Sequence, residues 1–149
     1  IFHETLSLLE SFLQKNRVET AVNIKAPVPR LYVDRYRIQT AFMNVIQNSL
    51  EAMPQGGTIT MSAHDVPAEH FVVITVGDTG WGMTPDVVEK VCEPFFSTKT
   101  SEGLRGLGMA IVRDIMKTHR GKMEIKSSPG QGTTVILYFP KFKDAEHFQ

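Results

Sequence analysis

Two glycine-containing segments hold the residues with the most specific chemistry. The segment 78–82 reads Asp-Thr-Gly-Trp-Gly and closely follows the apolar run 71–76. A carboxylate at a strand end can accept a hydrogen bond from an amine such as that of adenine. Glycine lets a planar ligand approach the backbone because it has no Cβ. We therefore predict that Asp78 contacts a base; the alternative is an aspartate that caps its own turn.

The second segment, 103–112, places three glycines ahead of an apolar stretch with helical spacing. A helix that begins in glycines offers unpaired N–H groups and the positive end of its dipole to phosphate. Glycine-rich turns are common, so this segment is a weak signal by itself. Taken together, the two segments predict a purine-nucleotide pocket.

Asn44 and Asn48 are spaced to share one face of a helix. Apolar residues flank both, and a buried amide needs several hydrogen-bond partners. The functional interpretation is a pair of neutral oxygen ligands for hydrated Mg²⁺ and phosphate, because a hard cation prefers oxygen. The alternative is a pair of amides that face solvent or cap the helix.

A long segment without periodicity, 93–107, contains Glu-Pro-Phe-Phe-Ser-Thr-Lys at its start. A structureless loop of this length is usually functional or mobile. One hypothesis is a hinged lid in which Lys99, with Arg105, meets the terminal phosphate. The alternative is an aromatic anchor followed by a solvated lysine.

The elements around these segments follow from hydrophobic periodicity and turn residues. Asp34 is the predicted N-cap of the helix that carries both asparagines, and Thr84-Pro85 predicts the start of a short helix. The predicted helices are 1–13, 34–53 and 107–118, and the predicted strands are 21–26, 58–63, 71–76, 123–127 and 133–139. This order predicts an α/β two-layer sandwich, with helices on one face of a mixed sheet.

Composition favours one soluble globular domain. The chain has 149 residues, 42% hydrophobic and 21% charged, with a formal net charge of zero. Zero net charge gives no argument for nucleic acid or an anionic membrane. No apolar run approaches the roughly 18–20 residues that span a bilayer. Cys92 is the only cysteine, which excludes an intrachain disulfide, and we expect a small core residue.

Five segments, taken in order, resemble the nucleotide-binding motifs of sensor histidine kinases. They are 44–48 (N box), 78–82 (G1 box), 93–99 (F box), 106–112 (G2 box) and 130–133 (last glycine motif). One such motif is weak evidence, but five in this order identify the chain as a member of the family over about residues 34–140. The F box is most similar to kinases of the nitrogen-regulation type. The resemblance implies the Bergerat, or GHKL, fold, with a mixed, mostly antiparallel sheet.

The resemblance also implies a role for each matching residue. Asp78 would accept from the adenine amine, and Asn48 would ligate Mg²⁺ between the phosphates of ATP, supported by Asn44. Lys99 and Arg105 would reach the phosphates from the lid, so that Asn44, Asn48 and Lys99 would form the catalytic set. The other implied contacts are those of Gly80, Gly82 and Met83 around the base, that of Thr133 with adenine through a water molecule, and those of Gly106, Leu107 and Gly108 with the phosphates.

Asn44 distinguishes this chain within the family. Hydrolytic members carry a glutamate at the matching position as general base, and an amide cannot take that proton. The resemblance therefore implies phosphoryl transfer rather than hydrolysis. Two departures from the family pattern are Leu104-Arg105 before Gly106, and Glu51 where some members carry a phosphate-binding lysine.

The phosphoacceptor histidine is expected to lie outside this chain, which we interpret as a fragment. His3 is followed by an acid, as in the family, but only about forty residues separate it from Asn44. That distance leaves no room for the family's acceptor hairpin. We expect residues 1–15 to be the end of a connecting helix or the first domain helix, 16–140 the ATP-binding catalytic domain, and 141–149 a C-terminal tail.

The expected function is that of the ATP-binding catalytic domain of a two-component sensor histidine kinase. The partners implied are the dimerisation and histidine-phosphotransfer domain of the same parent protein and a cognate response regulator. We expect a cytoplasmic location, with no nucleic acid and no direct membrane contact in this fragment, although the parent protein can be membrane-anchored. The alternatives are a non-catalytic nucleotide-binding interaction module of the same fold and a serine-directed GHKL kinase.

Overall fold

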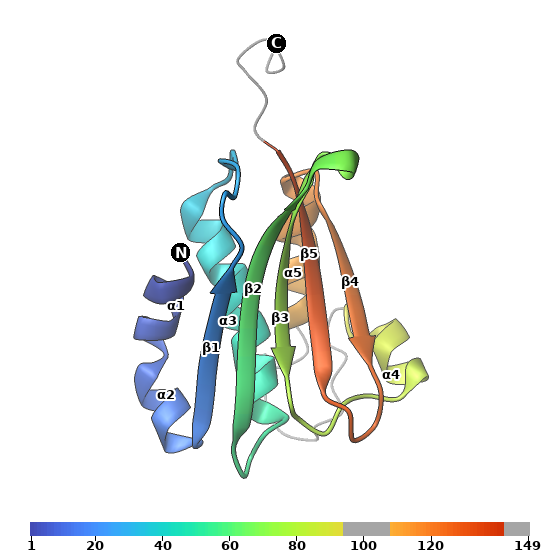
Figure 1. The fold of residues 1–149 in the computed structure, drawn as a ribbon. Helices are drawn as coiled ribbons and strands as arrows, with labels where there is room; N and C mark the ends of the chain where they lie inside the picture. Colours follow the sequence, from blue (N-terminus) through green and yellow to red (C-terminus); the bar gives the residue numbers. More distant parts are fainter. Residues whose placement is uncertain (94–107, 142–149) are drawn as a thin grey trace.

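Five strands form one mixed sheet in the computed structural model, which describes residues 1–93 and 108–141. The spatial order is β1-β2-β3-β5-β4 (Figure 1). β1 runs parallel to β2, and every other neighbouring pair is antiparallel. The strands are β1 (Val18–Ile24), β2 (Gly57–Val66), β3 (Phe71–Asp78), β4 (Lys122–Ser127) and β5 (Thr133–Pro140). The prediction of a mixed, mostly antiparallel sheet is confirmed.

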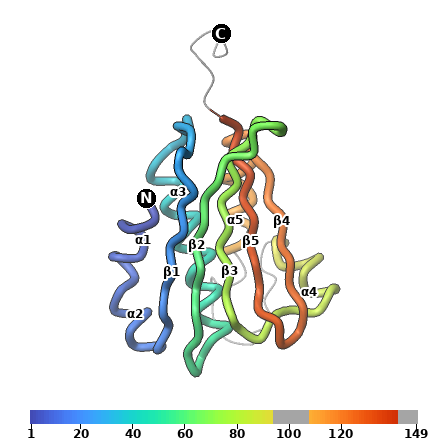
Figure 2. The backbone as a smooth tube through the Cα atoms, in the orientation of Figure 1, coloured from blue at the N-terminus to red at the C-terminus, as the bar shows by residue number. Residues whose placement is uncertain are grey.

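The helices cover one face of this sheet, as the ribbon and the backbone tube both show (Figures 1 and 2). Strand β3 and helix α3 lie centrally, and α3 packs beside α5. The helices are α1 (Phe2–Leu8), α2 (Glu10–Lys15), α3 (Arg35–Glu51), α4 (Pro85–Lys90) and α5 (Gly108–Thr118), with a 3-10 turn, η1 (Pro67–Glu69). This two-layer arrangement confirms the predicted α/β sandwich.

The core lies between the sheet and the helices because alternate strand residues are apolar. Met61, Val76 and Val135 are aligned across β2, β3 and β5, and their exposed fractions are 0%, 1% and 5%. Phe42 and Ile46 of α3 are also buried in this core. Because the buried face of α3 packs against the strands, the asparagines on the adjacent face of the same helix are held in a defined position.

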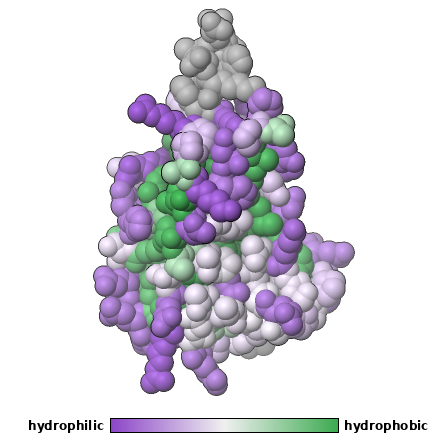
Figure 3. Space-filling view, viewed as in Figure 1, coloured by the Kyte–Doolittle hydropathy of each residue, from purple (hydrophilic) through white to green (hydrophobic). Residues whose placement is uncertain are grey.

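The opposite face of the sheet is the one seen in Figure 3. The edge strand β4 contributes exposed charged residues here, namely Lys122, Glu124 and Lys126. Val73 and Ile136 belong to the same face, yet their exposed fractions are only 5% and 9%. Charged side chains on an edge strand oppose pairing with another sheet, so β4 is protected against edge-to-edge association.

Two predicted elements differ most from the structure, and the predicted strand 58–63 also ends three residues before β2 does. The predicted helix 1–13 is two helices, α1 and α2, which meet at the buried Leu9. The predicted strand 21–26 begins earlier, at Val18, and ends at Ile24. The reason is the partner strand, because Val18 pairs with Gly57 and the register then continues to Ile24 opposite Ala63. The side-chain pattern of β1 alone does not identify its partner strand, and the ends of β1 follow from that partner.

Cys92 is half-buried directly after α4 and packs against the core. Burial raises the pKa of its thiol, and the nearby Arg113 opposes that effect only in part. A thiol with a raised pKa is a poor nucleophile. The observation agrees with the predicted structural role.

None of the described helices, in 1–93 and 108–141, combines the length and apolar character needed to cross a membrane.

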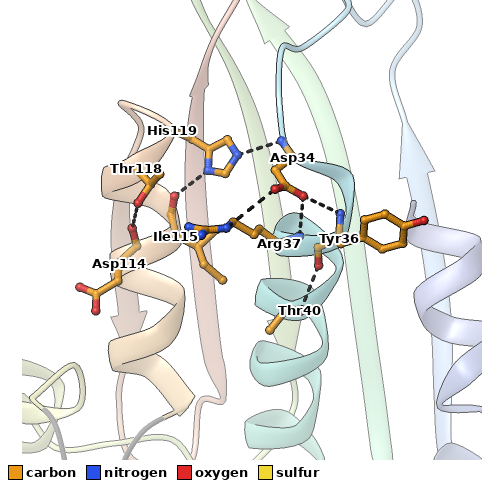
Figure 4. Close-up of polar contacts among 8 residues, drawn as sticks. All are labelled: Asp34, Tyr36, Arg37, Thr40, Asp114, Ile115, Thr118 and His119. Carbon is orange, nitrogen blue, oxygen red and sulfur yellow. Dashed lines mark hydrogen bonds and ion pairs between the residues drawn. The ribbon is translucent and has the colours of Figure 1, made fainter.

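The start of α3 is held by two residues. Asp34 is the N-cap, as predicted, and its Oδ1 accepts from the backbone N–H groups of Tyr36 at 3.1 Å and Arg37 at 3.2 Å. The backbone N–H of Asp34 donates to Nε2 of His119 at 3.0 Å (Figure 4). Nδ1 of His119 lies 2.7 Å from the carbonyl oxygen of Ile115, to which it donates. His119 therefore connects the end of α5 to the beginning of α3.

Replacing His119 with alanine is expected to lower the free energy of unfolding by about 1 kcal/mol, because a hydrogen bond between two helices is lost. Urea denaturation of the whole chain measures this. His3→Ala is the matched control, since His3 is exposed on α1, and we expect a change within about 0.5 kcal/mol. Equal losses in the two variants would contradict a connecting role for His119.

Candidate functional site

The predicted site residues lie where the last residue of β3 meets the first residue of β5, beside α3. Asp78 ends β3 and is paired in the sheet with Thr133, which begins β5. Helices α3 and α5 lie on the helix side of the sheet (Figure 2), and the first residue of α5 lies beside the asparagines of α3. Residues from four separate elements therefore converge, although they are far apart in sequence.

Asp78 accepts three hydrogen bonds from the described residues. Its Oδ1 accepts from the backbone N–H of Gly80 at 2.9 Å and of Thr133 at 3.2 Å. Its Oδ2 accepts from the hydroxyl of Ser49 at 2.8 Å. The bond to Gly80 is the turn-capping contact that we gave as the alternative for Asp78. A carboxylate has about four acceptor sites, so the turn contact still leaves room for a ligand.

Gly80 and Gly82 allow protein segments to approach one another. A Cβ on Gly80 would lie 2.7 Å from both Cβ and the carbonyl oxygen of Ala52. Gly82 has a φ of +73°, and a Cβ there would lie 2.0 Å from the carbonyl oxygen of Ser128. The structure thus adds a reason for these glycines, since the backbone of segment 78–82 is clamped between the end of α3 and the β4–β5 hairpin.

Ser127 joins two predicted residues, Met83 and Thr133. Its Oγ accepts from the backbone N–H of Met83 at 2.8 Å and donates to the carbonyl oxygen of Gly132 at 3.0 Å. The same oxygen lies 2.8 Å from Oγ1 of Thr133. The side of the site formed by the G1 segment is therefore tied to the last glycine motif through one hydroxyl.

Ser49 and Ser127 were not among the residues predicted from the sequence. For Ser49 a signal was present. It follows Val45 by one helical turn and so belongs to the buried face of α3, where a polar side chain needs a partner. For Ser127 we find no signal in the sequence, because its contacts depend on the position of the hairpin.

The two asparagines are half-buried and lie against the start of α5. Nδ2 of Asn44 donates to the carbonyl oxygen of Thr40 at 2.8 Å, which orients the amide. A Cβ built on Gly108 would lie 3.4 Å from Oδ1 of Asn44 and 3.9 Å from Oδ1 of Asn48. The amide oxygens of both residues therefore lie next to the first residue of α5, as a shared phosphate and metal site requires.

The donor set suits a hard cation. Mg²⁺ takes oxygen ligands, usually keeps several waters, and is bound through few protein ligands together with substrate phosphates. Within residues 1–93 and 108–141 there is no cluster of three or more His, Cys, Asp and Glu that could hold a metal. The residues present therefore fit Mg²⁺ that arrives with a nucleotide better than they fit a metal held by the protein alone.

Four predicted site residues lie outside the described part of the chain: Lys99, Arg105, Gly106 and Leu107. The same is true of most of the F box, of which only Glu93 is described. The lid and its phosphate contacts stay predictions.

Comparison with known proteins gives consistent matches. A family model described as histidine kinase-, DNA gyrase B-, and HSP90-like ATPase matches residues 33–143. Sporulation kinase E of Bacillus subtilis (strain 168) is 30% identical over 146 residues, which cover 98% of this chain and 19% of that protein. The sensor histidine kinase ZraS of Salmonella typhi is 31% identical over 140 residues, covering 94% of this chain and 30% of ZraS.

Solved structures agree with these matches. The catalytic domain of the histidine kinase ThkA, in a nucleotide-free form, superposes with a TM-score of 0.81 at 29% identity, covering 93% of this chain and 89% of that one. ThkA in complex with the response regulator protein TrrA gives a TM-score of 0.78 at 27% identity, covering 95% of this chain and 39% of that one. The chain spans less than a third of the two curated relatives named above.

Proposed function

Because the chain belongs to the family of histidine kinase-, DNA gyrase B- and HSP90-like ATPases and is the ATP-binding catalytic domain of a sensor histidine kinase, we propose that it transfers the γ-phosphoryl group of ATP to a histidine on a separate dimerisation domain. The observation that carries this proposal is the position of Gly108 against the amide oxygens of Asn44 and Asn48. It supports phosphate binding at the start of α5 with metal ligands on α3.

Each end of the nucleotide would have its own group of residues. Asp78 accepts from the amine of the base, and Thr133 is held beside it by the bond to Oδ1. Asn48 would hold Mg²⁺ through its amide oxygen, and Asn44 would support that position. When bound, Mg²⁺ neutralises the charge on the phosphates, which together with positioning supplies most of phosphoryl-transfer catalysis.

Asn44 favours transfer over hydrolysis. Its amide cannot accept a proton from water, so it cannot serve as the general base of a hydrolytic enzyme. The amide also has its Nδ2 committed to Thr40. The pocket therefore holds ATP without activating water at this position, and we assign the acceptor histidine to the separate dimerisation domain.

The proposal includes partners and a location. The acceptor domain belongs to the same parent protein, and a response regulator receives the phosphoryl group afterwards. The support for the second partner is the complex of ThkA with TrrA. We further propose a cytoplasmic location, where ATP is available, and a lid in which Lys99 and Arg105 meet the terminal phosphate.

Phosphotransfer tests the function directly. The chain is incubated with γ-labelled ATP, Mg²⁺ and the separately produced dimerisation domain, and acid-labile phosphate on that domain is measured. We expect labelling that disappears when the acceptor histidine is replaced by glutamine. Nucleotide binding without phosphohistidine would contradict transfer and favour an interaction module, whereas acid-stable phosphoserine on a protein partner would favour a serine-directed kinase.

Replacing Asn48 with alanine is expected to reduce the gain in ATP-analogue affinity that Mg²⁺ provides by at least about tenfold, since even supporting residues of metal sites cost that much. Affinity without Mg²⁺ should hardly change. Calorimetric titration with a non-hydrolysable ATP analogue, with and without Mg²⁺, measures both values. Gln47→Ala is the control, because Gln47 is exposed on the same helix. An unchanged Mg²⁺ effect in Asn48→Ala would show that Asn48 is no metal ligand.

A further inference from the structure

Ser49 makes a polar contact that the proposed function does not yet use. Its exposed fraction is 4%, and Thr5 and Ser49 are the buried polar residues among those described. The hydroxyl of Thr5 donates to the carbonyl oxygen of Ile1 on its own helix, at 2.8 Å. The hydroxyl of Ser49 instead connects α3 to β3, and its acceptor is the carboxylate of Asp78. A buried bond to a charged group is stronger than the helical one.

The hydrogen bonds at Asp78 limit what a ligand can do there. Oδ1 accepts from the N–H groups of Gly80 and Thr133, so its acceptor sites are occupied. Oδ2 accepts from Ser49 alone among the described residues. Since a carboxylate oxygen has about two acceptor sites, one site remains on Oδ2 for a ligand. That site can only take a hydrogen-bond donor.

We propose that Ser49 is a positioning residue that sets the base specificity of this pocket. By occupying one side of Oδ2, its hydroxyl holds the carboxylate in place and leaves a single acceptor site. A purine with an amino group at position 6 satisfies this site, and a purine with an oxo group there places oxygen against oxygen. The proposal rests on the proposed nucleotide binding and deepens it.

The physical reason is the fixed direction of the serine proton. The hydroxyl is buried and committed to Oδ2 at 2.8 Å, so it has no second proton to offer to a ligand. In the absence of the hydroxyl, a water molecule can occupy the space next to Oδ2. Water has two protons, so it can donate both to the carboxylate and to a 6-oxo group. Loss of Ser49 therefore removes part of the discrimination against the oxo base.

The test compares ADP with inosine diphosphate, which carries an oxo group in place of the 6-amino group. Calorimetry gives the ratio of the two dissociation constants, inosine diphosphate over ADP, for the wild type and for Ser49→Ala. We expect the ratio to fall about tenfold in the variant, as for a lost hydrogen bond to a charged group. Ser49→Cys preserves the size with a weak donor, and we expect an intermediate ratio.

Thr5→Val is the matched control, because it removes a second buried hydroxyl, which lies far from Asp78 in the sequence. This variant is expected to lower the stability of the protein and to leave the ratio of the two dissociation constants unchanged, since a general loss of stability weakens the binding of both nucleotides equally. An unchanged ratio in Ser49→Ala and Ser49→Cys, with ADP still bound, would overturn the role of Ser49. Failure of the wild type to bind ADP would overturn the proposed function itself, which is a separate result.

Discussion

Asp78→Asn is expected to reduce the affinity for ADP by roughly ten- to a hundredfold. Hydrogen bonds to a charged group are worth about 1.5–3 kcal/mol, and the amide loses that charge. Asparagine also has one oxygen where the carboxylate has two, while three donors approach it from Gly80, Thr133 and Ser49. Either the protein donors or the adenine amine would then face an NH₂ group.

Calorimetric titration with ADP measures this loss, and Asp65→Asn is its control. Asp65 is a second half-buried aspartate on a central strand, where it forms an ion pair with Lys141 at 2.5 Å, away from the predicted pocket. We expect wild-type affinity for that variant. Wild-type affinity in Asp78→Asn would mean that the base does not bind at the end of β3, and the site assignment would then be wrong.

Gly132→Ala is expected to lower the free energy of unfolding by about 3 kcal/mol or more, since it combines backbone strain with overpacking. Gly132 has a φ of +74°, and a Cβ there would lie 2.0 Å from the carbonyl oxygen of Asp78. The backbone of the β4–β5 hairpin would have to move away from β3. This movement would also separate the N–H of Thr133 from Oδ1 of Asp78.

The same hairpin provides the matched control. Gly130 has a φ of +76°, and no atom of residues 1–93 and 108–141 beyond its chain neighbours lies within 4 Å of a Cβ built there. Gly130→Ala therefore carries the conformational cost alone, roughly 1–2 kcal/mol. Urea denaturation of both variants separates the two effects. Equal losses would mean that the contact between Gly132 and Asp78 is unimportant and that only the backbone conformation matters.

Much of the fold was predictable because its signals are local. The apolar spacing of α3 and its N-cap Asp34 lie within single segments of the chain, and both were predicted correctly. The apolar segments in β2, β3 and β5 identified these three strands for the same reason, and β2 and β3 were predicted to be neighbours, but the pairing of β3 with β5 was not predicted. Helical and strand periods relate residues a few positions apart, so a sequence displays them directly.

The candidate site was predictable only in part. The spacing of Asn44 and Asn48 placed both residues on one helix face without any structure, and the order of the motifs indicated which segments form one nucleotide pocket. That Thr133 donates to Asp78, and that Gly108 lies against both asparagines, depends on how β5 and α5 pack. These contacts join residues many positions apart.

The types of residue available for chemistry, most of the helices and strands that carry them, and the family of nucleotide-binding proteins follow from the amino-acid sequence. The parallel register of β1, the backbone contacts at Gly82 and Gly132, and the bond from Ser49 to Asp78 follow from the folded domain. Local periodicity decides which face of an element is buried. The choice of partner depends on packing and chain closure over the whole domain.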